Sequence, residues 1–334
     1  MESWPYLQCP THQLPLTQQD SDEKRALVCA SGCRFPIVRG IPRFVNSANY
    51  AAGFGLQWKH FRKTQLDSHT GTTISRDRLR RCLGGSFEVI RNKSVLEVGC
   101  GAGRFTEVML AAGAQVFACD LSEAVEANYE NCRPSQNYFV CQADLRQLPV
   151  LPHSFDVVVC LGVIQHTPSP EETIARLANY LAPGGRLVID HYSHGYPQNF
   201  LQRNLRRILI RMPAGLSKVL ALTLARLLLP LHRSTWNLDR GSSRWRKLLL
   251  KHSPLIDYYE AYAHLGNELL SEWSVLDTHD SLTDYYKHFR TTEEIANCLS
   301  QCGLEEIEVS YGGNGVEAHA QMPAPASKLV GATP

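Results

Sequence analysis

The chain has 334 residues, of which 44% are hydrophobic and 20% are charged, and its formal net charge at pH 7 is +2. This length allows roughly two domains, and the composition is ordinary for a soluble globular protein. The small net charge excludes any identification of a partner from total charge alone.

The sequence carries several indications of its compartment. Its first residues lack a basic start followed by an apolar run, so we expect no signal peptide. The most apolar stretch, 216–229, is too short to span a bilayer and contains Lys218 and Arg226. Several of the eleven cysteines lie in apolar, strand-like runs, as buried free thiols do in a reducing compartment. We therefore expect a cytoplasmic protein.

Four potential metal ligands stand in two pairs near the N-terminus, Cys9 with His12 and Cys29 with Cys33. One tetrahedral Zn²⁺ takes such thiolate and imidazole donors, and a module this small could scarcely fold without a staple. The Cys-Pro start and the run 35–44 resemble the small zinc-binding domain of tRNA-methyltransferase partner proteins, although one pair here contains His and the other an extra residue. We predict a zinc-ribbon-like module over residues 1–45 with a structural Zn²⁺; the alternative is a zinc-free relic with the same fold.

An α/β pattern begins at Ser94, after residues 46–93, which predict helices and loops. Apolar runs predict strands, and the segments between them predict helices, one of them after a Ser122 cap. The expected strands are 94–98, 115–119, 138–142, 155–161 and 186–191, and the expected helices are 104–112, 123–132 and 171–181. This alternation predicts a parallel, doubly wound sheet with helices on both faces.

The alternation stops after residue 195. Residues 196–283 predict a helical insertion, with an apolar stripe at Leu201, Leu205, Ile208 and Met212. The core then resumes over 284–322, with a helix at 292–302 and strands at 305–310 and 316–320. Residues 323–334 are rich in Pro and Ala and predict a disordered tail.

A glycine loop follows the first strand of the core. Gly99, Gly101 and Gly103 alternate with other residues, and Glu97 precedes them. Such a loop between a strand and a helix lets a ligand approach the backbone and directs helix amides towards it. A nicotinamide cofactor would require glycine where Arg104 stands.

This pattern resembles motif I of class I methyltransferases, which bind S-adenosyl-L-methionine on a seven-stranded Rossmann-like core. The resemblance implies that the loop, with Cys100, holds the methionine part and that Glu97 helps to bind its ammonium group. Asp120 would accept the ribose hydroxyls, and Asp144 would bond the adenine amino group. The resemblance extends to the turn at 181–189, and it places further cofactor contacts at Leu121, Ala143, Leu145, Leu161 and Gly162.

Methyl transfer to a hydroxyl would be helped by a base with a pKa near neutrality, and we name His166 as the candidate. The run 162–168, Gly-Val-Ile-Gln-His-Thr-Pro, resembles the corresponding segment of type-11, ubiquinone-biosynthesis-like methyltransferases, although Gln165 replaces a His. The alternative is that His166 caps a helix or contacts the cofactor without taking a proton. His191 and Tyr192, with Asp190, end the fifth strand and are second candidates.

The segment Phe54–Asp67, which includes Trp58 and Phe61, resembles a stretch that precedes the core in methyltransferases of polysaccharide and natural-product gene clusters. It would fold over the cofactor, so we assign 46–93 to a helical cap. The alternative is that these aromatic residues belong to the core.

The insertion is strongly basic, because residues 196–253 contain twelve Lys or Arg and a single acid, whereas residues 254–334 contain thirteen acids and three bases. Four interpretations remain open: a lid with an apolar lining for a bulky acceptor, contact with anionic lipid headgroups, contact with nucleic acid, or docking on the acidic C-terminal region.

These observations favour a methyltransferase that acts on a small-molecule acceptor, such as a hydroxyl of a glycan, a lipid-linked compound or a secondary metabolite. Nucleic acid is disfavoured because the Asn/Asp-Pro-Pro-Tyr/Phe motif of amino-directed enzymes is missing. The alternatives are an RNA base methyltransferase, since some ribosomal guanine methyltransferases join a zinc module to a similar core, and a non-catalytic cofactor-binding protein.

Overall fold

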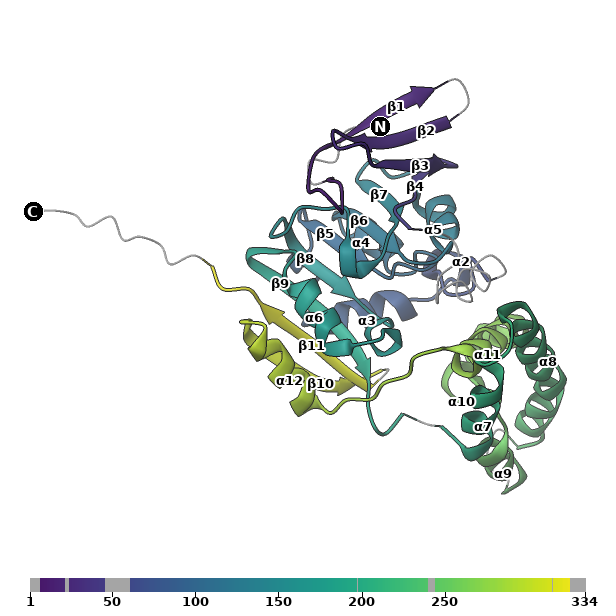
Figure 1. Ribbon diagram of the computed structural model, residues 1–334. Helices are drawn as coiled ribbons and strands as arrows, with labels where there is room; N and C mark the ends of the chain where they lie inside the picture. The colour runs from purple at the N-terminus through teal and green to yellow at the C-terminus, as the bar shows by residue number, and fades with distance from the viewer. Residues whose placement is uncertain are drawn as a thin grey trace, which may run out of the picture.

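The computed structural model describes residues 7–21, 24–45, 61–196, 198–239, 244–313 and 315–324. Its described part contains a small N-terminal sheet, a larger central sheet covered by helices, and a helical bundle beside the central sheet (Figure 1).

The central sheet has seven strands in the spatial order β10-β11-β9-β8-β5-β6-β7. Neighbouring strands run parallel except at β11, which is antiparallel to both β9 and β10. The strands are β5 (Ser94–Val98), β6 (Gln115–Asp120), β7 (Tyr138–Gln142), β8 (Phe155–Cys160), β9 (Leu181–Tyr192), β10 (Glu305–Gly312) and β11 (Gly315–Gln321). The predicted α/β doubly wound sheet is therefore confirmed, and its order reverses beside β5, where such folds bind ligands.

Both faces of the sheet are buried because successive side chains of a strand point to opposite sides. Leu96 and Phe117 belong to the cluster on one face, and Val95 and Val116 belong to the cluster on the other. The first face is covered by α6 (Pro170–Ala178) and α12 (Thr292–Gln301), and the second by α3 (Ile74–Cys82), α4 (Thr106–Ala111) and α5 (Val125–Cys132).

Two local predictions differ from the structure. Strand β9 begins at Leu181 rather than at Arg186, and it passes through Gly185, where a side chain would lie 2.9 Å from the carbonyl oxygen of Phe155. Ser122 is not the residue that precedes α5; its hydroxyl donates to Asp120 and accepts from the amide of Ala124. It therefore stabilises the turn at the end of β6.

The N-terminal sheet consists of the antiparallel strands β1 (Leu16–Ser21), β2 (Lys24–Cys29), β3 (Arg34–Val38) and β4 (Ile41–Pro42). It is joined to the edge strand β7, since the amide of Phe44 donates to the carbonyl of Gln142 at 2.8 Å. Arg43 also bonds the side chain of Gln142 and pairs with Glu126, each at 3.0 Å. The module thereby covers an edge that would otherwise expose unpaired backbone groups.

Much of the expected helical cap lies outside the described residues, including Phe54, Trp58 and His60, and so does 325–334 of the expected tail. The described part of the cap begins at Phe61, which is buried against the helical insertion, and continues through α2 (Asp67–Thr70) into α3.

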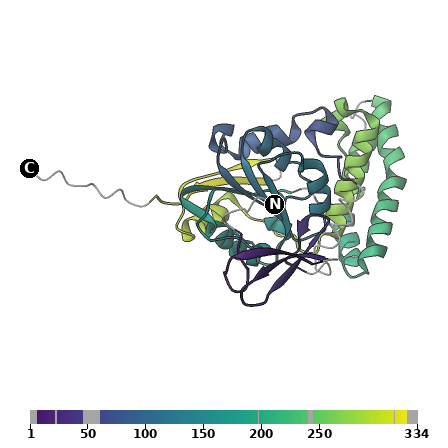
Figure 2. The same ribbon diagram turned by 90° about the horizontal axis from the view of Figure 1, so that it is seen from above.

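The insertion contains α7 (Phe200–Leu209), α8 (Ala214–Asp239), α9 (Arg244–His252), α10 (Tyr259–Tyr262) and α11 (Gly266–Thr283). Helix α11 lies between α8 and the central sheet (Figures 1 and 2). The predicted stripe on α7 is borne out in part: Leu205 and Met212 pack against the bundle, whereas Leu201 and Ile208 are 43% and 53% exposed. The buried side carries Leu209 and Gln202, whose amide donates to the carbonyl of Pro254.

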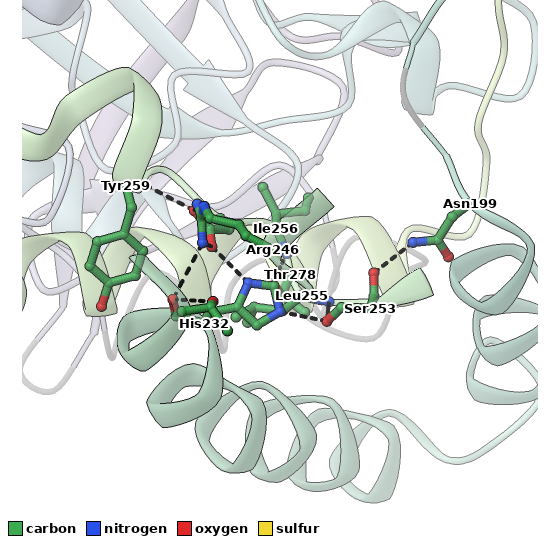
Figure 3. Close-up of polar contacts among 10 residues, drawn as sticks. Asn199, His232, Arg246, Ser253, Leu255, Ile256, Tyr259 and Thr278 are labelled. Atoms are coloured by element: carbon green, nitrogen blue, oxygen red, sulfur yellow. Dashed lines mark hydrogen bonds and ion pairs between the residues drawn. The ribbon is translucent and has the colours of Figure 1, made fainter. Parts of the chain in front are cut away.

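A buried polar network fastens α8 to α9 and to the segment before α10 (Figure 3). His232 bonds Asp257 through Nδ1 and Ser253 through Nε2, each at 2.7 Å, and Arg246 pairs with Asp257 at 2.8 Å. This is the connectivity of a hydrolase triad, but His232, Asp257 and Ser253 are buried and do not line the cavity described below. The network is therefore structural.

Candidate active site

A cavity of about 250 Å³ lies at the carboxyl ends of the central strands, between the sheet and the insertion. One half is lined by residues that follow the strands: Gly99, Cys100, Gly101, Asp120, Leu121, Ala143, Asp144, Leu145, Leu161 and Gly162. The other half is lined by Arg78, Arg104, His166, Tyr192, Tyr196, Tyr258, Asp277 and Asp280. We call these the motif half and the insertion half.

The glycine loop enters the motif half by its backbone. Gly99 has φ of 77°, and a side chain there would lie 2.2 Å from Cγ2 of Val163, so no other residue fits. Gly103 does not line the cavity. A side chain at Gly103 would lie 3.0 Å from Sγ of Cys132, so this glycine allows α5 to approach the loop.

Glu97 also does not line the cavity, in contrast to the predicted contact with the cofactor. It is 3% exposed and accepts a hydrogen bond of 2.5 Å from Thr106 behind the loop. Burial raises the pKa of its carboxyl to about 8, although the bond from Thr106 opposes this. Glu97 therefore supports the loop from behind.

Asp120 connects the loop to the end of β6. One oxygen accepts from the amide of Gly101 at 3.0 Å, and the other accepts from the amide and hydroxyl of Ser122 at 2.8 and 2.6 Å. Burial raises the pKa of its carboxyl, and these hydrogen bonds oppose the rise. The carboxylate is thus held at the cavity wall in a fixed orientation.

Asp144 follows β7 and lies further along the same wall. It accepts a hydrogen bond of 2.9 Å from the amide of Arg146 and pairs with the guanidinium of that residue at 2.5 Å. Burial raises the pKa of Asp144, but the bonds from Arg146 outweigh burial and lower it. The side chain therefore remains an acceptor at neutral pH.

His166 lies where the two halves meet. Its Nδ1 is 3.0 Å from the carbonyl oxygen of Tyr286 and 3.4 Å from Oδ2 of Asp284. Because a carbonyl only accepts, the neutral ring carries its hydrogen on Nδ1 and takes up a proton at Nε2. Burial alone would lower the pKa of His166, but Asp284 raises it above its ordinary 6.5.

Of the second candidates for the base, only Tyr192 lies at the cavity. Tyr192 lines the cavity and stacks on Tyr196 with ring centroids 4.0 Å apart, and burial raises its pKa, so it is a hydroxyl donor rather than a base. His191 is 1% exposed and lies outside the cavity, where burial lowers its pKa to about 4. Asp190 also lies outside, bonded to the amide of Gly162 and paired with Arg78. The structure thus does not place His191 or Asp190 where a base would act.

Sequence reasoning missed most of the insertion half. Tyr258 donates to Asp277, which also accepts from Gln65 at 3.4 Å, and Arg104 bonds Gln65 at 2.8 Å. Burial raises the pKa of Asp280 to about 7. One signal was available, because Asp277 and Asp280 recur at helical spacing and so share one face of α11, with Asp284 directly after the helix.

The four predicted metal ligands come together in the N-terminal module. The ligand atoms of Cys9, His12, Cys29 and Cys33 all lie within 4.8 Å of one another. Nδ1 of His12 is 3.8, 3.5 and 3.4 Å from the three sulfur atoms. Ligands at the corners of a tetrahedral zinc site are about 3.5–3.8 Å apart, given their usual bond lengths to the ion. The donor set and its spacing thus fit Zn²⁺.

Comparison with known proteins agrees with this geometry. A family model described as a methyltransferase domain, of type 11, matches residues 96–189. A ubiquinone biosynthesis O-methyltransferase of Coxiella burnetii is 33% identical over 110 residues, which are 32% of this chain and 47% of that protein. The protein of the same name from Pseudomonas paraeruginosa is 28% identical over 179 residues, which are 51% of this chain and 73% of that protein.

The chain contains a class I S-adenosylmethionine-dependent methyltransferase domain. It spans about half the length of the first curated relatives that it matches. Solved structures similar to this chain include a SAM-dependent methyltransferase from Aquifex aeolicus (13% identity, 80% of this chain, 98% of that chain, TM-score 0.43). Another is magnesium protoporphyrin IX methyltransferase from Synechocystis with bound SAH (15% identity, 81% of this chain, 95% of that chain, TM-score 0.41).

Proposed function

We propose that the protein transfers a methyl group from S-adenosyl-L-methionine to a hydroxyl of a small-molecule acceptor. The observation that carries the proposal is the two-part cavity, in which a glycine loop and two carboxylates face a histidine that is paired with Asp284. The acceptor belongs to the glycans, lipid-linked compounds or secondary metabolites. Relatives named O-methyltransferases support oxygen as the methylated atom.

The motif half fits the cofactor. The backbone at Gly99–Gly101 would hold the methionine part, Asp120 would accept the ribose hydroxyls, and Asp144 would accept from the adenine amino group. When bound, S-adenosyl-L-methionine supplies a methyl group already activated by a sulfonium. The residues of the chain therefore have to align the acceptor oxygen and exclude water.

His166 would take the proton of the acceptor hydroxyl as the oxygen attacks. Asp284 and the carbonyl of Tyr286 fix its ring and leave Nε2 as the basic nitrogen. The raised pKa keeps the imidazole a sufficiently strong base near neutral pH. Tyr192, whose ring centroid is 5.3 Å from that of His166, would orient the acceptor.

The insertion half favours a polar acceptor. The sequence led us to consider an apolar lining for a bulky compound, but Arg78, Tyr258, Asp277 and Asp280 line this part. Nε of Arg78 and Oδ1 of Asp280 are buried without a hydrogen-bond partner within the part of the chain that the structure describes, so a hydroxyl group of the acceptor can satisfy them and an apolar ligand cannot. A polyhydroxylated acceptor, or the polar head of a lipid-linked one, therefore fits best.

The test is a screen of hydroxylated metabolite fractions with methyl-labelled S-adenosyl-L-methionine. We expect label in an ether, and none when Asp120→Ala replaces the wild type at low cofactor concentration. Label on RNA bases, with binding that weakens steeply as salt rises, would instead favour the RNA alternative. A wild-type protein that binds the cofactor but labels no fraction would favour the non-catalytic alternative.

We also propose that Cys9, His12, Cys29 and Cys33 hold a structural Zn²⁺. Four protein ligands leave no open position, so the ion would supply folding energy rather than catalysis. We expect about one zinc per chain by elemental analysis and loss of this zinc in Cys29→Ser. Cys302→Ser, at a half-buried thiol far from the cluster in the sequence, is the matched control and should retain the metal. Zinc-free wild type that unfolds at an unchanged temperature after metal addition would contradict the proposal.

We assign the protein to the cytoplasm on its cysteines. Eight cysteines lie outside the proposed zinc site, and most of these are free thiols buried in the hydrophobic clusters. Thiols in this state persist in a reducing compartment.

A further inference from the structure

The outer surface of the helical insertion is apolar to an unusual degree. Of the sixteen large apolar side chains that are exposed among the described residues, twelve lie between Phe200 and Leu250. Leu238, Trp245 and Phe200 are 81%, 76% and 74% exposed. Soluble monomers rarely concentrate exposed apolar side chains in this way, and such surfaces usually bind a partner.

On α8 the exposed leucines form a single stripe. The opposite side of the helix, with Ala221, Ala225 and His232, is buried against the rest of the bundle. Figures 1 and 2 both place α8 on the side of α11 that is remote from the sheet, so the stripe faces outward. At about 100° per residue, five exposed leucines fall within about 60° of the helix circumference; they are Leu216, Leu220, Leu227, Leu231 and Leu238.

Basic side chains accompany the apolar surface. Residues 196–253 contain twelve Lys or Arg and one acid, Asp239. Arg206 and Arg246 are used internally, since Arg206 pairs with Asp284 and Arg246 with Asp257. Those that are exposed include Arg203, Arg207, Arg211, Arg226, Arg233, Arg244, Lys247 and Lys251. The occupant of this surface must therefore bury leucine side chains and also carry negative charge.

We propose that α7, α8 and α9 dock on the surface of an anionic phospholipid bilayer. The leucines and Trp245 would enter the boundary between headgroups and acyl chains, while the arginines and lysines contact the phosphates. A second copy of the chain would bring two basic surfaces together, and a nucleic acid would leave the leucine stripe against water. An anionic lipid surface satisfies both requirements.

The contacts of α8 determine that it lies on the bilayer rather than across it. Among the described residues, Ala214–Leu238 has the length and hydropathy of a membrane span, with a mean hydropathy of 1.6 and 22% of the best window buried. However, His232 is bonded to Asp257, whose other partner is Arg246, and both charged groups are 1% exposed (Figure 3). Withdrawal of α8 would leave this pair buried without its third member and would place Arg226 and Arg233 in hydrocarbon.

Docking would bring the insertion half of the cavity close to the lipid, because Tyr258, Asp277 and Asp280 belong to the same bundle. This consequence rests on the proposed function and favours the lipid-linked class of acceptor. Membrane binding itself does not depend on methyl transfer and can be measured without an acceptor.

The test is co-sedimentation of the full chain with vesicles of equal parts phosphatidylcholine and phosphatidylglycerol, and with vesicles of phosphatidylcholine alone. We expect the protein to bind the anionic vesicles and to bind the neutral ones about tenfold more weakly. The variant Leu227→Ser/Leu231→Ser/Leu238→Ser should bind the anionic vesicles about tenfold more weakly than the wild type. The variant Arg233→Gln/Arg244→Gln/Lys247→Gln should also bind weakly and should lose most of the salt dependence.

The matched control is Leu151→Ser/Tyr311→Ser, which removes two exposed apolar side chains outside the insertion and should bind like the wild type. Circular dichroism would establish that each variant is folded. The proposal is overturned if the wild type stays in the supernatant with anionic vesicles, or if the leucine variant binds as well as the wild type. Light scattering that shows a dimer, abolished by the leucine substitutions, would identify a second copy as the occupant and would also overturn it.

Discussion

The two halves of the cavity differ in how the chain positions their residues. In the motif half, Gly99, Asp120 and Asp144 lie at or just after the carboxyl ends of β5, β6 and β7, so the sheet alone brings them together. In the insertion half, Tyr258 and Asp277 reach the cavity because a separate helical bundle docks on the core. A cofactor site can therefore be retained by local sequence, whereas an acceptor site depends on tertiary packing and is free to diverge.

His166→Ala tests the seam between the halves and should have the largest effect. If His166 takes the proton, kcat should fall about 10²–10⁴-fold while the affinity for S-adenosyl-L-methionine stays within about twofold. Steady-state kinetics and calorimetry measure the two quantities separately. A variant with full turnover would remove His166 from the mechanism and leave the two halves functionally uncoupled.

Asp120→Ala, compared with Glu97→Gln, sharpens the definition of the motif half. Loss of the hydrogen bonds to a charged acceptor should weaken cofactor binding by about 2–3 kcal/mol, which is about 30- to 150-fold. Glu97→Gln should change the affinity little, because Glu97 lies behind the loop and bonds Thr106. Equal losses in both variants, measured by calorimetry, would mean that Glu97 touches the cofactor after all.

Asp284→Asn examines the electrostatic support that the insertion gives to His166. The base form of His166 is present only above its pKa, which Asp284 raises, so kcat should increase with pH through a midpoint above 6.5 in the wild type. Removing the carboxylate leaves burial, which lowers the pKa, so the midpoint should move to lower pH. An unmoved midpoint in the pH–rate profile would separate Asp284 from His166. Thermal unfolding would control for the lost pairs with Arg206 and Lys287.

Tyr258→Phe should have the smallest effect, and we expect that effect to be limited to binding in the insertion half. It removes the hydroxyl that donates to Asp277 in the cavity wall. We expect KM for the acceptor to rise severalfold, by the value of about one hydrogen bond, with cofactor affinity unchanged. Weaker cofactor binding instead would show that the two halves are not independent.

The motif half could be predicted in detail from the sequence, because the apolar runs that form its strands and the glycines and acids that follow them are local patterns. The bounds of β5 and β7 agree with the prediction, and ten of the twelve residues expected at the cofactor lie in the cavity wall, with Glu97 and Gly103 displaced behind it. Those two differ because a motif records that a residue is needed and does not distinguish contact with the ligand from support of the loop. His191 lies outside the cavity, unlike the neighbouring Tyr192, because successive residues of β9 point to opposite faces of the sheet.

The insertion could not be predicted in the same way. Its helices were expected, but only part of the apolar stripe of α7 packs against the bundle, since apolar spacing alone does not reveal which side of the helix is buried. The capping box of Asn199 and Gln202 decides that orientation, together with the bond from Gln202 to Pro254. The partner of that bond is distant in sequence, and no local pattern indicates it.

The join between the N-terminal sheet and β7 has a mechanical consequence. Arg43 holds the side-chain oxygen of Gln142, and the nitrogen of the same amide donates at 3.0 Å to the carbonyl of Leu121 in the cavity wall. The side chain of Gln142 thus connects the N-terminal sheet directly to the wall of the motif half. We therefore expect that a change which loosens the N-terminal sheet also makes the cavity wall at Leu121 less rigid, although the sheet is distant in sequence from that wall.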